Sequence, residues 1–572
     1  MRYSRTLLLI LCILLIAIST ESGSLQAQTS KKPLTIEDVE LWRNNSTTLS
    51  DDGMWYTVLY SLIEKADDDS NKKDDKSKKD SIDISLYGKD ARTDVLYIFS
   101  TKKGLKHEIP LGNNPVFSSS SEWIAYTITP KDSAKTPKEK ESKTIELRNL
   151  KTGLTKQYKS NARYHFPEDK DLFITSDKNS LLVYDLNKLS EYYIGNMGEY
   201  LVDKLSGYIV YTIASEDKRG NGIYLYDPIN MTTKALVTGN NTYSNLAWNT
   251  DFTSLAALSY NLKKEEVDYK NMNIVLISGI DRADSKKSEI MVKDLEGMPE
   301  LMGPATKNEQ TTHPLVWSKN NEQLFIKIKE YKDESESDKE DKKETKKDDE
   351  TASVNVWHWK DEKLLSQRML EEERNNNKVY DAVINLKSKS IIRLSSEEIQ
   401  SLTISKGTDS WAVGRDNRLY ISDWDVRKND LYRINLSNGD KKLIIESYPG
   451  SFELSPGGNK MILWESDHYW YYNLEEDRMK NISSGLDISF INDENDHFGF
   501  TPNYGFVGWV KDRDAIIVNH KLDLWLIPLD SEEEAENITA SFRKDDEIRF
   551  RFEDMSFSRK PEIEERYIDL SS

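Results

Sequence analysis

Residues 49–58 read LSDDGMWYTV. An apolar residue leads into a turn of Ser, Asp and Gly, and an alternating run of aromatic and β-branched residues follows. Turn residues beside such a run are typical of two antiparallel strands joined by a tight connection. The same arrangement returns at residues 117–126, 246–258, 315–328, 404–413, 454–464 and 509–518.

A second pattern, of the Leu-Tyr-x-x-Asp kind, alternates with the first. It occurs at residues 96–99, 182–186, 223–227, 431–435 and 524–527. Together the two patterns make about nine candidate units, some of which are halves of one unit. Short strands separated by polar turns at this spacing are typical of propeller blades. The sequence predicts an all-β fold, a single β-propeller of seven to nine four-stranded blades, with eight as the expected number.

Large aromatic side chains recur within these units. A four-stranded blade cannot bury both of its faces alone, so neighbouring blades must stack, and a closed ring hides the strand edges. We interpret the recurring tryptophans as packing between blades and not as ligand-stacking groups. They are Trp55, Trp123, Trp248, Trp317, Trp411, Trp464 and Trp509.

The N-terminal segment has the pattern of an export signal. Arg2 and Arg5 precede an apolar run from Leu7 to Ile18, and polar residues lead to a cleavage site after Ala27. The alternative, a transmembrane anchor, fits less well because twelve helical residues rise about 18 Å against a hydrocarbon core of about 30 Å. We expect an exported protein, periplasmic or secreted, with no membrane span after signal cleavage and without the single cysteine, Cys12.

The remaining chain divides by composition. Residues 28–48 are expected to hold a short helix and a lead-in, residues 49–545 the propeller, and residues 546–572 a final strand or connector. Three charged insertions lie near residues 64–90, 131–143 and 331–352. In the last of them, residues 332–350 have no apolar side chain whose burial could offset the ordering entropy. We expect these insertions to be disordered.

Charge and motif content exclude several functions. The net charge of -19 would repel phosphates, so we expect no nucleic-acid partner. The sequence has no Gly-x-Ser-x-Gly elbow, phosphate loop, His-Glu-x-x-His or calcium-loop motif. The seven histidines are scattered. We therefore expect no catalytic residue, no metal site and no cofactor.

Adjacent acidic residues are the candidates for substrate binding. Glu371 and Glu372 could hold a substrate ammonium group by charge-assisted hydrogen bonds. The alternative is that they belong to a solvated loop between two strands.

Two stretches resemble a known family. One is Val356 to Asp361, reading VWHWKD and followed by Gln367, and the other runs from GWVKD at residues 508–512 to DLW at 523–525. Both are similar to segments of the N-terminal β-propeller of prolyl oligopeptidase, or S9, serine peptidases. The resemblance is to the exported dipeptidyl-peptidase-IV-like type of Bacteroidetes.

The resemblance implies a role in peptide hydrolysis. In that family the propeller caps an α/β-hydrolase domain and limits entry to peptides. The catalytic domain is expected to be missing from this chain, which would then be inactive alone. Members that hold the substrate N-terminus use a glutamate motif, and neither Glu371-Glu372 nor Glu265-Glu266 has its sequence context.

Two functions remain open at this point. The first is the substrate-gating propeller of an exported S9-type serine peptidase, with peptides or a separate hydrolase subunit as partners. The alternative is a stand-alone exported propeller that binds a protein or a glycan. The oligomeric state has no signature in the sequence.

The charged insertions give a first testable prediction. Limited trypsin digestion should cut first among the lysines of residues 332–347 and 72–79, because exposed loop tips are nicked preferentially. Mass mapping of the earliest fragments checks this. First cuts within residues 509–525 would contradict it.

Overall fold

A computed structural model describes most of the chain. The described residues are 43–62, 95–104, 106–129, 143–159, 163–177, 179–203, 206–263, 266–280, 285–306, 313–331, 378–405, 407–422, 424–497, 499–530, 533–542, 548–552, 567–568 and 570. The predicted signal peptide at residues 1–27 and the part of the predicted helix and lead-in that precedes residue 43 fall outside these ranges. So do the insertions, apart from their outermost residues.

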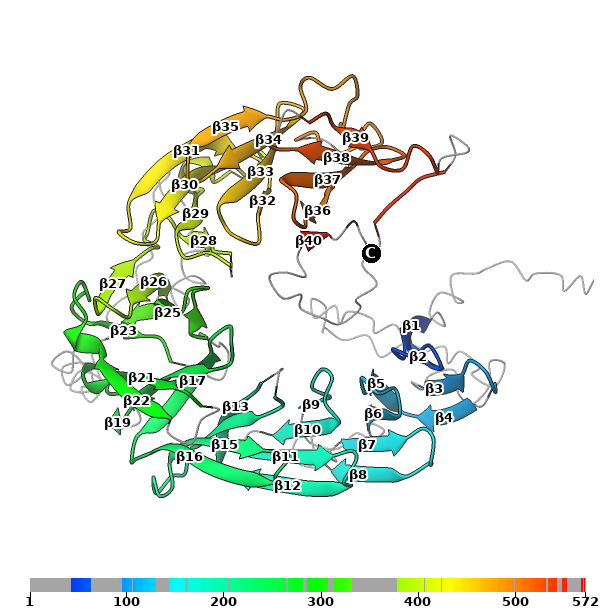
Figure 1. The fold of residues 1–572 in the computed structure, drawn as a ribbon, viewed down its shortest axis with the longest axis vertical. Coiled ribbons are helices and arrows are strands. Elements are labelled where there is room, and N and C mark those ends of the chain that lie inside the picture. Colours follow the sequence, from blue (N-terminus) through cyan, green and yellow to red (C-terminus); the bar gives the residue numbers. More distant parts are fainter. Residues whose placement is uncertain are drawn as a thin grey trace, which may run out of the picture. The chain divides into compact units, whose positions relative to one another are not determined.

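The described residues form the four-stranded antiparallel sheets of a β-propeller of about eight blades. This confirms the predicted fold class. Two compact units divide the described chain, the first reaching Asp177 and including residues 186–188, and the second holding the rest. Figure 1 labels the strands in chain order.

The first unit contains two complete sheets and a hairpin. Their strands are β1 (Arg43–Leu49), β2 (Trp55–Leu62), β3 (Val95–Ser100) and β4 (Lys106–Pro110); β5 (Gly112–Phe117), β6 (Trp123–Ile128), β7 (Thr144–Asn149) and β8 (Thr155–Lys159); and β9 (Arg163–His165) with β10 (Leu172–Asp177). Consecutive strands pair antiparallel within each of the two sheets.

The second unit begins with a hairpin, β11 (Ser180–Asp185) and β12 (Ser190–Gly195). Its first sheets are β13 (Met197–Val202), β14 (Ile209–Ile213), β15 (Gly222–Asp227) and β16 (Thr232–Thr238); β17 (Thr242–Trp248), β18 (Ser254–Tyr260), β21 (Asn273–Ser278) and β22 (Lys286–Met291); and β23 (Met302–Pro304), β24 (Val316–Trp317), β25 (Gln323–Glu330), β26 (Val379–Asn385) and β27 (Ser390–Arg393). A small ribbon joins β19 (Leu262–Lys263) to β20 (Glu266–Val267).

Three further sheets complete the second unit. They are β28 (Ser401–Thr403), β29 (Trp411–Asp416), β30 (Asn429–Asn435) and β31 (Lys441–Tyr448); β32 (Phe452–Leu454), β33 (Lys460–Glu465), β34 (His468–Asn473) and β35 (Arg478–Asn481); and β36 (Phe506–Val510), β37 (Ala515–Asn519), β38 (Leu524–Pro528), β39 (Glu536–Asn537) and β40 (Tyr567–Ile568). Short 3₁₀ turns lie at Tyr269–Asn271, Val292–Asp294 and Arg418–Tyr420. No helix among the described residues is long and apolar enough to cross a membrane.

The repeated LSDDGMW-type pattern folds as the hairpin between the first two strands of a sheet. In the first sheet the Ser50 amide donates to the Trp55 carbonyl at 2.9 Å, and the Trp55 amide donates to Ser50 Oγ at 3.0 Å. The same side-chain acceptor recurs in the pairs Ser118–Trp123, Asn249–Ser254, Ser318–Gln323 and Ser455–Lys460. Each acceptor residue is at most 3% exposed. The polar residue is therefore part of the buried hydrogen-bond network.

One backbone conformation accompanies this turn. The third residue after the buried acceptor has a left-handed φ, at Gly53 (66°), Ser121 (57°), Phe252 (54°), Asn321 (59°) and Gly458 (72°). Glycine adopts this conformation without a steric penalty, whereas Ser and Phe do so only when the surrounding hydrogen bonds hold them. The turn geometry is thus shared even where the sequence lacks a glycine.

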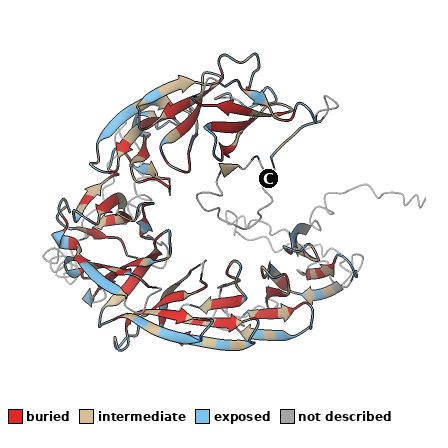
Figure 2. Cartoon of the chain, viewed as in Figure 1, coloured by how far each residue is buried: buried red, intermediate tan, exposed pale blue. Residues whose placement is uncertain are grey.

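Burial follows the order of strands in a sheet. The second strands β6, β18, β33 and β37 are buried along almost their whole length, whereas the last strands β16, β22 and β31 are largely exposed. Figure 2 shows this change from red to pale blue across the sheets. Strands covered on both faces carry continuous apolar runs. That accounts for the run of buried residues from Leu255 to Tyr260 in β18.

The apolar core lies between successive sheets. One cluster joins Leu258 and Ile274 of one sheet to Leu324 and Ile384 of the next. Trp317 belongs to this cluster, and its indole N–H donates to the backbone carbonyl of Ala247 at 3.0 Å. The other predicted packing tryptophans are buried or packed against such clusters, namely Trp55, Trp123, Trp248, Trp411, Trp464 and Trp509.

Core packing between sheets leads to a stability prediction. Leu258→Ala should lower the free energy of unfolding by about 2–5 kcal/mol, because Leu258 is fully buried and its loss leaves a cavity. Chemical denaturation measures the change. Leu419→Ala, at a residue that is 81% exposed, is the control and should change it by less than about 0.5 kcal/mol. Equal effects of the two substitutions would contradict the assigned burial.

Candidate functional site

The family-like pattern at residues 508–525 lies in the last sheet of the second unit. Trp509 is in β36 and Trp525 in β38, and both pack in the apolar cluster shared with the preceding sheet. The Asp523 side chain is buried, where Oδ1 accepts a hydrogen bond from the Thr539 hydroxyl at 3.1 Å. The aspartate of the Asp-x-Trp pattern therefore fixes the start of β38.

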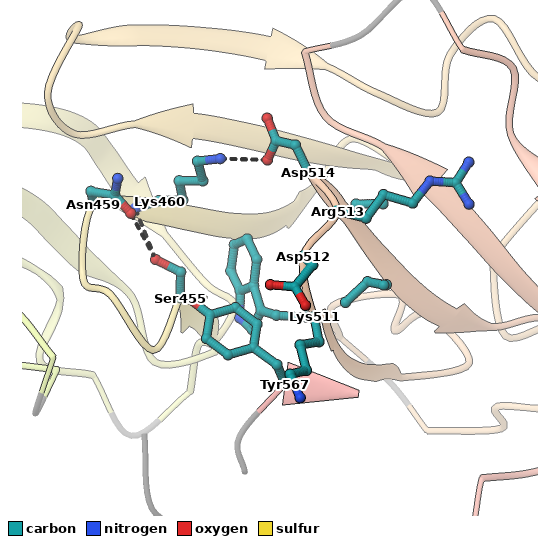
Figure 3. Close-up of a pocket in the computed structure, with 11 residues that line it drawn as sticks. Ser455, Asn459, Lys460, Lys511, Asp512, Arg513, Asp514 and Tyr567 are labelled. Carbon is teal, nitrogen blue, oxygen red and sulfur yellow. Dashed lines mark hydrogen bonds and ion pairs between the residues drawn. The ribbon is translucent and has the colours of Figure 1, made fainter. Parts of the chain in front are cut away.

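A cavity of about 530 Å³ opens beside this pattern. It lies between the turn from Ser455 to Lys460 and the turn from Val510 to Ala515, with Tyr567 of β40 on a further side. Figure 3 shows the labelled side chains around it. The volume is within the range of sites that bind small ligands or single side chains.

Charged side chains of both signs line the cavity. Lys460 forms an ion pair with Asp514, and the Arg513 guanidinium contacts Glu533 at 2.9 Å. Figure 3 shows Lys460 and Asp514 meeting, while Arg513 extends away from them. These pairs are partly exposed, so each contributes only about 0–1 kcal/mol to stability. Breaking one of these ion pairs so that its side chains can contact a ligand would therefore cost little free energy.

Aromatic and backbone groups form the rest of the lining. Trp509 is 5% exposed. Burial raises the pKa of the Tyr567 phenol, while a hydrogen bond with the backbone of Gly457 lowers it by less. The phenol is therefore neutral at physiological pH. This wall offers apolar contact and neutral hydrogen-bonding groups.

The serine of the cavity is held by neighbouring groups of its own turn. This residue, Ser455, accepts from the Lys460 amide at 3.1 Å, and its hydroxyl contacts Asn459 Oδ1 at 3.3 Å. No histidine is among the described residues that line the cavity. A nucleophile needs a base within hydrogen-bond reach, and Ser455 has none among the cavity residues.

A serine and a histidine do meet elsewhere in the second unit. Ser483 Oγ is 3.4 Å from His468 Nδ1, but Ser483 is 2% exposed and its Oγ also accepts from the Tyr469 amide at 2.9 Å. This buried hydroxyl joins the segment after β35 to Tyr469 of β34. Within the described ranges no group of three or more His, Cys, Asp or Glu residues could hold a metal ion.

The substrate-binding candidates from the sequence, Glu371 and Glu372, lie outside the described residues, as does the Val356 to Asp361 stretch. The sequence analysis expected a final strand or connector at residues 546–572, but it did not point to the cavity or to the pairing of β40 with β36. One signal was available in Gly508, because a glycine inside a strand often marks the close approach of another backbone or ligand.

The first unit contains a buried charged network between strands β6, β7 and β8. Glu146 accepts hydrogen bonds from the Tyr126 hydroxyl, from Arg148 at 2.7 Å and from Gln157 at 2.7 Å. Burial alone would raise the pKa of Glu146, but the bonds from Tyr126, Gln157 and Arg148 outweigh burial and lower it. Arg148 Nε also donates to the Tyr126 hydroxyl at 3.0 Å, so these side chains link the three strands to one another.

Comparisons with known proteins give fold likenesses only. No family model and no curated protein matches the chain. Similar solved structures include a eukaryotic initiation factor, 9% identical over 77% of this chain and 88% of that chain, with a TM-score of 0.31. The β-propeller domain of the Trilobed protease from Pyrococcus furiosus is 11% identical over 71% and 99%, with a TM-score of 0.25. A prolyl endopeptidase is 10% identical over 76% and 55%, with a TM-score of 0.29. These names include an initiation factor and peptidases, so they do not select one activity.

The Glu146 network predicts a pH dependence. A carboxyl whose pKa is lowered by folding stabilises the protein above its unfolded pKa, near 4.5, and this stabilisation is lost as pH falls through the folded pKa. Glu146→Gln should cost about 1–3 kcal/mol at pH 7, because Arg148 loses its charged partner. The difference from the wild type should shrink below about pH 4.5.

Unfolding midpoints of both proteins between pH 7 and pH 3.5 measure this. Glu122→Gln is the matched control, since the Glu122 side chain is 42% exposed and pairs with the exposed Lys151. It should change stability little at any pH. A pH-independent difference between wild type and Glu146→Gln would refute the assigned role of the charge.

Proposed function

We propose that this chain is the substrate-gating β-propeller portion of an exported S9-type serine peptidase. The observation that carries the proposal is the Trp509 and Asp523-x-Trp525 pattern. It occupies β36 and β38 of the last sheet, and in the S9 propellers that it resembles this pattern precedes the catalytic domain. In this role the chain limits access to peptides and does not cleave bonds.

The chemistry of the cavity in the last sheet agrees with a peptide ligand. Aromatic walls from Trp509 and Tyr567 suit side chains, and the flanking pairs of Lys460 with Asp514 and Arg513 with Glu533 can exchange partners with the polar groups of a peptide. The net charge of -19 disfavours a polyanionic ligand.

The partner and the location follow from the same proposal. Bond cleavage would be supplied by an α/β-hydrolase part, such as a separate subunit. The signal-like segment at residues 1–27 supports export to the periplasm or beyond. The alternative is an exported propeller that binds an unrelated protein or a glycan.

The proposal predicts that the purified chain does not hydrolyse peptides. Loss of a triad serine or histidine alone costs about a million-fold in rate, and the described residues contain no such triad. X-Pro and X-Ala chromogenic peptides and a fluorophosphonate probe test this. Stoichiometric labelling of one serine of this chain would overturn the prediction.

A pull-down from the source periplasm separates the two functions. Recovery of a hydrolase subunit that cleaves the same peptides supports the gating propeller. Recovery of only unrelated proteins or glycans would favour the binding module and would reject the peptidase proposal.

A further inference from the structure

The last sheet carries an added strand on one edge. β40 pairs with β36 in parallel, with Trp509 opposite Tyr567 and Val510 opposite Ile568. Figure 1 draws it as a short arrow beside β36. All other paired strands of the described chain are antiparallel. Without β40, strand β36 would be the edge of this sheet, with backbone groups open to pairing.

A glycine makes room for the added strand. A Cβ atom on Gly508 would lie 2.7 Å from Ile568 Cδ1 and 3.1 Å from Ile568 Cγ1, and among the described residues other than its chain neighbours it would contact nothing else within 4 Å. Gly508 does not have a left-handed φ. A glycine is therefore needed here because the Ile568 side chain packs against its Cα, and not because of the backbone conformation. We call the surface at Gly508 on which Ile568 packs the seat.

Backbone and apolar contacts hold the seated residues. The Lys511 amide donates to the Ile568 carbonyl at 2.8 Å. Ile568 packs on the cluster of Val510 and Ile517, and Tyr567 packs on the cluster that contains Trp509. Both seated side chains remain half-buried. The two residues are therefore held by main-chain hydrogen bonds, by the apolar seat under Ile568 and by the aromatic cluster beside Tyr567.

Space continues beyond the added strand. Tyr567 forms one wall of the 530 Å³ cavity, whose other walls include Lys460 and Asp514. If the pairing of β40 with β36 served only to fix the end of the chain, it would not require an open cavity with charged walls beside Tyr567. A longer peptide strand could place its next side chain there.

We propose that the edge of β36 is a strand-addition site for an extended peptide in which an aliphatic residue follows an aromatic one. Tyr567 and Ile568 occupy this site within the chain and thereby keep it closed. Strand addition takes its affinity from main-chain hydrogen bonds and its specificity from side-chain seats, as arranged here. The inference does not depend on the peptidase assignment, because it concerns binding and not hydrolysis.

The occupant is suited to displacement. Among the described residues, Tyr567 and Ile568 form this pairing, and its occupancy depends on the high effective concentration that a covalent connection provides. A free peptide therefore competes poorly with the intact chain. It should bind well once the seated isoleucine is removed.

The test uses the full chain and a fluorescent peptide that copies residues 563–570. Ile568→Asp places a charge in the apolar seat and should expel β40. Leu570→Asp adds the same charge at a residue that is 48% exposed and should leave β40 in place. Anisotropy measures peptide binding, and hydrogen exchange at the Lys511 amide reports whether the site is occupied.

The peptide should bind the Ile568→Asp chain at least tenfold more tightly than the wild type or the Leu570→Asp chain. Exchange at Lys511 should be fast in Ile568→Asp and should slow again when peptide is added. Adding Gly508→Val to Ile568→Asp should abolish binding, because the valine fills the seat. A peptide with Asp at the isoleucine position should not bind.

Two results would overturn the proposal. One is equal binding of the peptide to all variants. The other is absence of binding to Ile568→Asp when its Lys511 amide exchanges fast and its circular dichroism matches that of the wild type.

Gly508→Val alone provides a second route if Ile568→Asp fails to fold. It changes only the seat and should speed exchange at Lys511 while leaving the unfolding midpoint within a few degrees. Unchanged protection of Lys511 in this variant would also refute the site.

Discussion

A buried oxygen at the start of a strand hairpin is the interaction that recurs through this protein. Ser50, Ser118, Asn249, Ser318 and Ser455 each accept a hydrogen bond from the backbone amide of the residue five positions later, and each of these five acceptors is buried. A buried amide without a partner would cost roughly 1–3 kcal/mol. The turn also fixes the register of the two strands, and a slip of one residue would move every apolar side chain to the opposite face.

Correct register then allows the sheets to pack on one another. Leu258 and Leu324 meet in one of these clusters, and Trp464 and Trp509 meet in another. The stability of each sheet therefore depends on its neighbour, and the last strand of each sheet can stay exposed. Repetition of one hairpin is sufficient to build most of the fold because each new sheet supplies the surface that the preceding sheet needs.

The last sheet departs from this repetition at its edge. There Gly508 leaves a seat that Ile568 fills, and a cavity with the Lys460–Asp514 ion pair adjoins it. The proposed gating function and the proposed strand-addition site place peptide recognition at the same part of the molecule. They differ in what they require, since gating needs a catalytic partner, whereas strand addition needs only the edge of β36.

The sequence by itself determined the strand-turn-strand repeats, the all-β class and the packing role of the tryptophans, because a turn such as Ser50 to Trp55 and the alternation beside it involve only neighbouring residues. It offered Glu371 and Glu372 as candidates for binding, and these lie outside the described residues. Only the tertiary structure decided that Ile568 lies against Gly508 and that a cavity opens beside them. Strand pairing between residues so far apart in the chain depends on which edge is left free after the sheets have formed. Gly508 marks a close approach at that edge, but nothing near it in the sequence says that Ile568 is the partner.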